Sequence, residues 1–404
     1  MWFWTLLLAA YLLTVRALRY RRRMHSTSHR YRHLTTSPEA LGHMTLQEAF
    51  DIQLDLAELE FPITFSVSNF FALFKTYGIP SISQLLSRTG ELAGQTTASK
   101  RAADTGVLLT EFVLNRPGTD RNLDAIARMN WLHDLYRKSG KIKDDDMLYT
   151  LSLFALEPMM WTKKLEWREL TDLERCAMAL YWKNMGDVMG ISSDRLPSFT
   201  SGWANAVEWL KELEAWSNKY EVENMVPHPT NRVLADATIG IGFTNVPQFL
   251  RPLGTQFASA LLSSRLRKAM IYPEPPAWVQ ATLDLGIFLR KLILRYLCPP
   301  RPQFMRPQWF SKADPKTGKY HAEQYIGLPW YVEPSFSHRW NLNSWLLWLT
   351  GGHVPSKATP EYRPEGYKIQ ELGPVQLEGK GLKEMQAARD AIAKLQGCPF
   401  HMKK

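Results

Sequence analysis

Cysteine is scarce in this chain of 404 residues. The three cysteines, Cys176, Cys298 and Cys398, are too few and too scattered to form a disulfide framework. The sequence therefore predicts a body that works in a reducing compartment such as the cytosol.

Runs in which apolar and polar residues alternate are also missing, and no Gly/Ser linker or internal repeat divides the chain. Both absences favour an all-α fold with a single large helical domain. Apolar residues recur at helical spacing over 45–58, 66–76, 81–92, 96–115, 121–138, 145–157, 172–189, 203–219, 247–271 and 277–297. Thr171 and Glu174 form a capping box, Gly140 follows one predicted helix as a stop, and Pro158 is expected to end another.

Several catalytic signatures are absent. The chain has no Glu-x-x-His pair for a di-iron bundle, no His-x-Asp for a mononuclear iron triad and no His-Glu-x-x-His for zinc. Gly240-Ile-Gly242 lacks the third glycine of a dinucleotide fingerprint, and neither Gly-x-Ser-x-Gly nor a phosphate-binding loop occurs. Nicotinamide, hydrolase and nucleotide functions therefore lose support.

No acidic residue precedes Glu39, and no charged residue lies between Trp2 and Val15. Extended to Leu18, this apolar run would span about 26 Å as a helix, close to the hydrocarbon core of about 27 Å in the endoplasmic reticulum. A cleaved signal peptide is the alternative, but its basic residues should come before the apolar run, and here they follow it. We expect a single-pass anchor in the endoplasmic reticulum membrane, with a lumenal N-terminus and a cytosolic body.

The net charge of +10 is concentrated next to this anchor. Seven basic residues lie between Arg16 and Arg32, which leaves 42 basic against 39 acidic residues elsewhere. The basic cluster fits lipid headgroups and membrane topology better than a phosphate backbone, so no nucleic-acid partner is expected.

Two helical segments carry the candidate site. His133 lies on a helical face with Ile126, Met129 and Tyr136, and Arg137 follows it by about one turn. The other nine histidines fall in basic, loop-like or terminal stretches, so His133 is the best candidate for a cofactor ligand. An imidazole on an apolar face is the kind of ligand that haem iron uses. A hydrogen-bonded core histidine remains the alternative.

In the preceding segment, Arg101, Asp104 and Thr105 share one helical face. Two such helices packed together would enclose a polar spot within an apolar wall. A surface ion pair between Arg101 and Asp104 is the alternative interpretation.

Toward the C-terminus, residues 299–364 are rich in proline and aromatic rings. These rings could plug one end of a helical bundle or form an apolar wall for a long substrate. The helix at 277–297 could rest its basic face on a membrane, or be buried with its arginines solvated. The segment 381–396 is expected to be an amphipathic surface helix.

A family resemblance rests on five segments. They are FKTYGIPSISQLLSRTGEL (74–92), KRAADTGVLLTEF (100–112), RMNWLHDLYR (128–137), DLERCAMALYWKNMGDVMGI (172–191) and SSRLRKAMIYPEPPAW (263–278). Together they resemble the fungal MpaB-type oxygenases, which are distant relatives of the latex-clearing rubber oxygenases. The resemblance implies a globin-like helical core that binds haem b, and dioxygen as co-substrate. It further implies cleavage of a C=C bond in the farnesyl side chain of an aromatic precursor, as in mycophenolic acid biosynthesis.

The resemblance also implies roles for individual residues. His133 matches the proximal ligand of the iron, Arg137 the arginine one turn later, and Arg101 and Thr105 a polar pair on the neighbouring helix. Asp104 stands where rubber oxygenases have a lysine that can cap the haem, so that capped state is not available here.

Arg101 or Arg128 could pair with the haem propionates. The expected catalytic set is thus Arg101, Asp104, Thr105 and Arg137, with His133 and Arg128 binding the cofactor. Glu91 is the nearest counterpart of the distal glutamate base.

The expected organisation has three parts: an anchor with its basic segment at 1–33, a haem oxygenase core at 40–300, and an extension at 301–404 that packs on the core. A farnesylated substrate partitions into membranes, which would explain the anchor. The main alternative function is a membrane-tethered isoprenoid or lipid carrier without catalysis.

Overall fold

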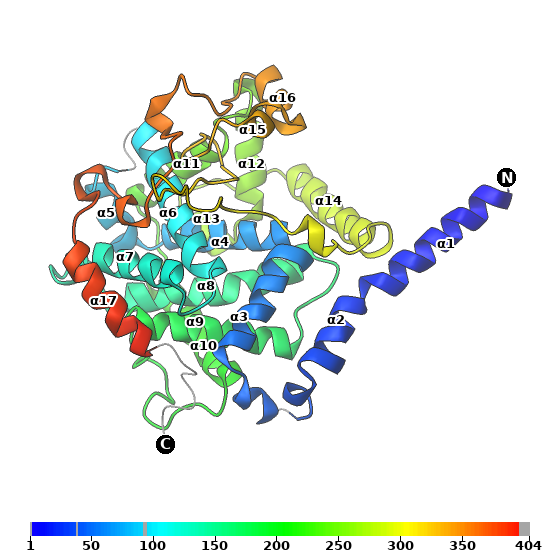
Figure 1. Cartoon of the computed structure of the whole chain (residues 1–404), viewed down its shortest axis with the longest axis horizontal. Helices are drawn as coiled ribbons and strands as arrows, with labels where there is room; N and C mark the ends of the chain where they lie inside the picture. Colours follow the sequence, from blue (N-terminus) through cyan, green and yellow to red (C-terminus); the bar gives the residue numbers. More distant parts are fainter. Residues whose placement is uncertain (1, 38, 92–94, 396–404) are drawn as a thin grey trace.

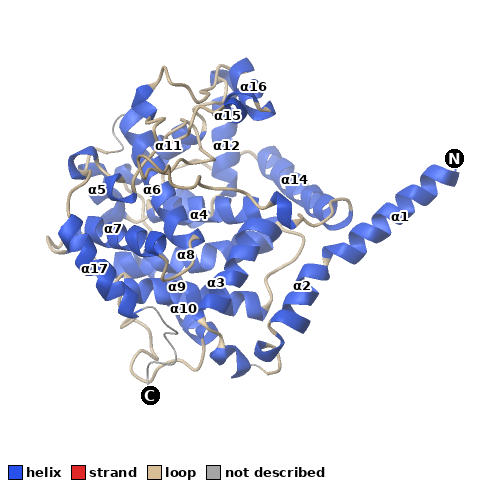
Figure 2. Ribbon diagram, viewed as in Figure 1, coloured by secondary structure: helices blue, strands red, loops and turns tan. Residues whose placement is uncertain are grey.

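The computed structural model describes all residues except 1, 38, 92–94 and 396–404. The described part is mostly helical, and its only β-pairing consists of two isolated bridges, Phe310 with Ala322 and Tyr320 with Tyr367 (Figures 1 and 2). The predicted all-α fold class is therefore confirmed. Within the described residues, Cys176 and Cys298 form no disulfide, while Cys398 lies outside the described part of the chain.

The centre of the body is a pair of long helices, α8 (Asp144–Leu165) and α9 (Asp172–Val188). α9 is buried on almost every side and begins at the predicted capping box of Thr171 and Glu174. Packed around this pair are α3 (Leu46–Asp55), α4 (Pro62–Thr76) and α10 (Ala206–Asn224).

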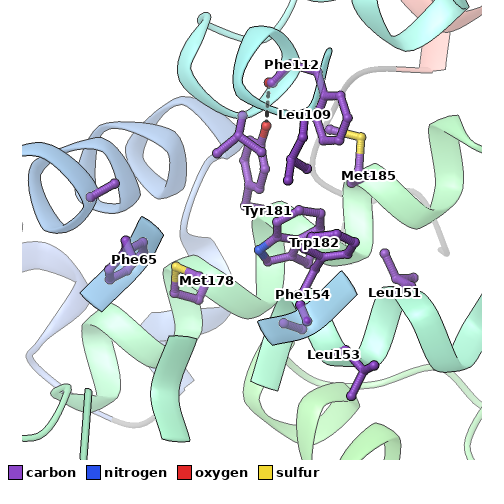
Figure 3. Close-up of a cluster of buried hydrophobic side chains, with 14 of the residues drawn as sticks. Phe65, Leu109, Phe112, Leu151, Leu153, Phe154, Met178, Tyr181, Trp182 and Met185 are labelled. Atoms are coloured by element: carbon purple, nitrogen blue, oxygen red, sulfur yellow. Dashed lines mark hydrogen bonds between the residues drawn. The ribbon is translucent and has the colours of Figure 1, made fainter. Parts of the chain in front are cut away.

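Aromatic side chains fill the core between these helices (Figure 3). The rings of Phe154 and Trp182 stack with their centroids 5.0 Å apart. The buried Tyr181 hydroxyl donates to the backbone oxygen of Phe112 at 2.8 Å and so ties α9 to α6 (Gln95–Leu114). The buried tyrosine thus satisfies its one polar atom.

The site is carried by a second group of helices on the other side of this core. α6 packs against α7 (Asp120–Arg137), and α17 (Leu382–Leu395) covers α7 from outside. α11 (Pro229–Gly242) packs against α6, and α5 (Pro80–Arg88) packs against α11.

The remaining helices lie toward the ends of the chain. They are α1 (Trp2–Arg19), α2 (Arg21–His25), α12 (Arg251–Leu261), α13 (Ser264–Ala269), α14 (Ala277–Tyr296), α15 (Phe336–Trp340) and α16 (Leu342–Leu349). Short 3₁₀ or π turns occupy Ser26–Arg30, Arg32–Leu34, Glu39–His43, Leu56–Glu60, Gln248–Leu250, Gln303–Met305, Pro360–Tyr362, Ile369–Glu371 and Val375–Leu377.

Two helix boundaries differ from the sequence prediction. Pro158 lies inside α8, which continues to Leu165, so the prediction that it ends the helix is wrong. Pro158 is buried where α8 packs along α4, and this packing holds the helix despite the lost backbone donor. The segment 247–271 is not one helix, because Leu262 adopts an extended conformation and Ser263 caps a new helix.

Within the described residues, one helical stretch, Trp2–Arg30, is long and apolar enough to cross a membrane. α1 projects away from the body, with the N-terminus at its far end (Figure 1). The segment after α1 belongs to the body: Tyr31 is 4% exposed, and Arg22 and Arg30 pair with Glu60 and Asp51 at 2.8 and 2.9 Å.

Candidate functional site

The contact between α6 and α7 brings Arg101 close to His133. The imidazole of His133 is half-buried, and its Nδ1 is buried without a hydrogen-bond partner among the described residues. Burial, together with the positive charges of Arg101 and Arg137, lowers the pKa of His133 to about 4. The imidazole is therefore neutral at physiological pH and keeps a lone pair for a ligand.

Arg101 is half-buried, and among the described residues its guanidinium has no ion pair or hydrogen bond. Its charge acts on His133, on the hydroxyl of Tyr77 and on Asp104. Burial raises the pKa of Tyr77, whereas Arg101 and a hydrogen bond with Thr238 lower it. An unpaired arginine beside a neutral imidazole can bind a carboxylate or another anion.

Thr105 lies one turn after Arg101, and its hydroxyl donates to the backbone oxygen of Arg101 at 2.8 Å. The hydroxyl proton is thus used within α6, so Thr105 can offer a ligand only its acceptor lone pairs. A Cβ added at Gly106 would meet no atom within 4 Å, so open space borders α6 at this level.

Asp104 does not join this group. Its carboxylate is buried, accepting from Lys100 at 2.7 Å and from the Tyr331 hydroxyl at 2.5 Å. Burial raises the pKa of Asp104, and the Lys100 ammonium opposes that rise. Since Lys100 also donates to the backbone oxygen of Gly373 at 2.9 Å, the pair ties α6 to the C-terminal extension. The alternative interpretation, a surface ion pair between Arg101 and Asp104, is not seen among the described residues, where Lys100 pairs with Asp104 instead.

The structure places Arg128, the second residue predicted to bind the cofactor, against the C-terminal extension. Its side chain is fully buried and donates to the backbone oxygens of Leu372, Leu377 and Lys380 at 2.8, 2.9 and 3.0 Å. Its guanidinium lies 4.7 Å from the ring centroid of Trp131. Burial lowers its pKa to about 10. Arg128 therefore holds the C-terminal extension against α7 and has little capacity left for a propionate.

Arg137 is likewise occupied. It donates to the backbone oxygens of Met189 and Gly190 at 3.1 and 2.9 Å, at the end of α9. Asn130, on the same face of α7, donates to Val188 at 2.9 Å. These contacts satisfy terminal carbonyls at the end of α9, and Arg137 also pairs with Asp144 at 3.3 Å. Its charge acts on His133, and its catalytic role stays a prediction.

Glu91 lies in the connection between α5 and α6, next to residues outside the described part. Its backbone N–H donates to the Thr89 hydroxyl at 3.4 Å, and none of its described contacts reaches His133.

Sequence reasoning missed the partners of these groups. Tyr331 stands 227 residues from Asp104, and no local pattern pairs them. The one available signal was that an acid within an apolar helix requires a donor, which predicts that a partner exists but not which residue it is.

A hollow of about 640 Å³ lies near the site, between α5 and the end of α7. Tyr136, one turn after His133, forms part of its wall. The other walls are largely polar or basic, including Gln84, Arg88, Lys141 and Lys143. An isoprenoid chain requires apolar walls, so this hollow suits a polar group instead.

Within the described residues, no three His, Cys, Asp or Glu side chains gather as a metal site would require. The site therefore offers one protein ligand, His133, beside one unpaired cation, Arg101. Fold and site together define a helical protein with a candidate N-terminal membrane anchor and a single-histidine site between two packed helices.

Comparison with known proteins identifies the family. No family model matches the chain. The ER-bound oxygenase mpaB′ of Penicillium brevicompactum is 43% identical over 397 residues, covering 98% of this chain and 93% of the relative. The ER-bound oxygenase mpaB of the same fungus is 40% identical over 360 residues, covering 89% of this chain and 84% of the relative. The ER-bound oxygenase mpaB of Penicillium roqueforti is 46% identical over 268 residues, covering 66% and 89%.

The chain therefore belongs to the family of ER-bound oxygenases of the MpaB type. Membership makes it an oxygenase associated with the membrane of the endoplasmic reticulum, in agreement with its apolar N-terminal helix.

Proposed function

We propose that this oxygenase uses haem b and dioxygen to cleave a C=C bond in the farnesyl side chain of an aromatic precursor. The observation that carries the proposal is the neutral His133 imidazole, whose buried Nδ1 lacks a partner, beside the unpaired Arg101. The C=C bond and the O–O bond both break, and each former alkene carbon receives one oxygen atom. The products are two carbonyl fragments.

The residues of this site fit haem, but fewer of them are available to contact it than the sequence predicted. A porphyrin supplies four of the iron's ligands, so a single neutral histidine, His133, is sufficient from the protein. Arg101 would hold a propionate or the carboxylate of a substrate, because no described residue forms an ion pair or hydrogen bond with its guanidinium. Haem, when bound, supplies the activation of dioxygen.

The remaining residues position this pair. Arg137 and Asn130 fix α7 against the end of α9, and Arg128 fixes α7 against the C-terminal extension, so His133 sits on a helix held from both sides. Thr105 can accept a hydrogen bond from a bound polar group. Burial and the nearby positive charges lower the pKa of His133 and keep its imidazole unprotonated.

Membrane attachment supports a hydrophobic substrate. A farnesyl chain partitions into the bilayer, and an anchored enzyme meets it at high local concentration. We propose that the N-terminus is lumenal and the body cytosolic, because the basic residues follow α1 and favour the cytosolic side.

The alternative function, an isoprenoid carrier without catalysis, is consistent with the membrane anchor but not with membership of an oxygenase family. An oxygenase and a carrier differ in whether the bound substrate is converted. Membranes containing the full chain should convert a farnesylated aromatic acid to shortened carbonyl products in air, with label from ¹⁸O₂ in both fragments by mass spectrometry.

A His133→Gln variant should lose this conversion, while Leu135→Gln, an exposed change two residues away on α7, should keep it. Equal conversion without dioxygen, or unlabelled products, would contradict the proposal. Binding of intact substrate without turnover would favour the carrier.

A further inference from the structure

Helix α14 is amphipathic with its apolar side facing outward. Trp278, Leu285, Leu289 and Tyr296 lie within about 20° of one line along the helix, and all four are exposed. Two of its basic residues contact the body instead: Arg290 pairs with Glu166 at 2.9 Å, and Lys291 donates to the backbone oxygen of Lys163 at 2.9 Å.

This arrangement differs from both sequence-based interpretations of residues 277–297. The basic side cannot rest on a membrane, because it is bound to the body, and the helix is not buried. A surface helix of a soluble protein normally shows the opposite orientation. The apolar side of α14 therefore faces something other than water.

Two neighbouring helices extend this surface. On α16 the exposed residues are Leu342, Trp345, Leu346, Trp348 and Leu349. Around the start of α12 they are Phe249, Leu250 and Leu253. Phe257 of α12 contacts Trp278 of α14, with ring centroids 6.2 Å apart. The end of α16 is tied to the loop before α12, since the backbone N–H of His353 donates to Asn245 at 3.0 Å.

We name the exposed apolar residues of α12, α14 and α16 the apolar face. Soluble monomers rarely expose so many large apolar side chains on neighbouring elements. Its tryptophans are the residues that favour the boundary between lipid headgroups and acyl chains. Asp284 and Arg295 lie at the flank of the α14 stripe and not at its centre. At the flank, water or lipid headgroups could solvate their charges.

The anchor fixes where this face lies. The Tyr11 hydroxyl donates to the backbone oxygen of Leu297 at 2.6 Å, and Arg19 donates to that of Cys298. Tyr11 lies in the middle of the apolar run, so insertion of α1 carries the end of α14 to the membrane. In Figure 1, α12, α14 and α16 lie on the side of the body toward which the free end of α1 points.

We propose that the apolar face is a second membrane contact, which inserts into the headgroup region of the bilayer that α1 spans. The occupant is lipid, because the face is continuous with the anchor through the Tyr11–Leu297 contact. The proposal does not depend on haem or on catalysis. With this second contact, the body lies on the membrane surface as a monotopic domain, and α1 is not its only attachment to the bilayer.

The test uses the full chain in nanodiscs of phosphatidylcholine and phosphatidylserine. A nitroxide is attached in turn to Phe288→Cys and Trp348→Cys, with Cys298 and Cys398 replaced by serine. Collision with dioxygen, which concentrates in lipid, is compared with collision with a water-soluble nickel chelate. Leu8→Cys reports the anchor, and Val222→Cys, exposed on α10, reports the water-facing surface.

We expect the ratio of dioxygen to nickel collisions at Phe288→Cys and Trp348→Cys to exceed that at Val222→Cys several-fold and to approach that at Leu8→Cys. A ratio equal to that at Val222→Cys would overturn the proposal. Protection from both reagents, with dipolar broadening between labels, would overturn it in favour of a second copy of this chain. Aqueous signals at Leu8→Cys and Phe288→Cys together would overturn the anchor and the second contact alike.

Discussion

Burial is the main reason why the pKa of His133 is low, and the charges of Arg101 and Arg137 add to it. Helical spacing was sufficient to place His133 on an apolar face and Arg101 on the neighbouring helix. It could not assign Arg128 or Arg137, because their partners are backbone oxygens at 372–380 and 189–190, far away in the sequence. Spacing predicts which side of a helix a residue occupies but not what covers that side.

The low pKa of His133 predicts acid sensitivity of the protein without bound haem. Between pH 6.5 and about pH 4 the unfolded chain binds a proton at this histidine that the folded chain does not. The free energy of unfolding should therefore fall as the pH drops through this window, by at most about 3 kcal/mol. In denaturant unfolding, the free energy of unfolding of His133→Phe should fall less between pH 6.5 and about pH 4 than that of the parent. An equal fall in both proteins would contradict the burial of a neutral imidazole.

Arg101 should contribute to anion binding through its charge. Arg101→Leu is expected to weaken haem retention by about tenfold or more, because it removes a charge-assisted hydrogen bond, whereas Arg101→Lys should retain part of it. Retention can be measured by haem transfer to apomyoglobin. Arg88→Leu, an exposed arginine on α5, is the control, and loss there equal to that of Arg101→Leu would contradict the role.

At the scale of helices, local signals predicted the helix starts better than the ends. The capping box at Thr171 lies where the sequence placed it, as does the helix at 381–396, observed as α17. α11 and α16 were missed, and α8 passes through Pro158. These differences share a cause, since contacts with distant segments decide the outcome and no local pattern records them.

The start of α17 depends on close approach to α7. Gly381 has φ +76°, and a Cβ there would come within 2.0 Å of the Trp131 indole. Gly379 has a similar φ of +65° but free space around it. Gly379→Ala should cost about 1 to 2 kcal/mol from backbone strain alone, and Gly381→Ala substantially more. Thermal unfolding measures both, and equal effects would show that α17 does not pack here as described.

At the scale of the whole molecule, the N-terminal segment serves two purposes. Trp2 to Val15 supplies the candidate membrane span, whereas Arg22, Arg30 and Tyr31 hold the following segment to the body. The sequence predicted the span from its lack of charge. It assigned 1–33 to the anchor as a unit because the contacts of Tyr31 lie outside that segment.

Two truncations separate these purposes. Deleting residues 2–14 should make the protein extractable by alkaline carbonate, while the apolar face keeps it peripherally bound to vesicles. Deleting residues 1–33 should also destabilise the body, by about 2 to 3 kcal/mol for the lost burial of Tyr31. Sedimentation and thermal unfolding report the two effects. Equal stability of the two truncated proteins would contradict the role of the 15–33 segment.

The central claim is that His133 is the single protein ligand of a haem. The most direct test is the absorption spectrum of the purified full chain, before and after reduction, beside that of His133→Gly with and without added imidazole. We predict a Soret band with one haem per chain in the parent, its loss in the variant, and its return with imidazole, which replaces the missing side chain. A parent chain without a Soret band after haem reconstitution, or a His133→Gly protein with full haem content and an unchanged spectrum, would contradict the account.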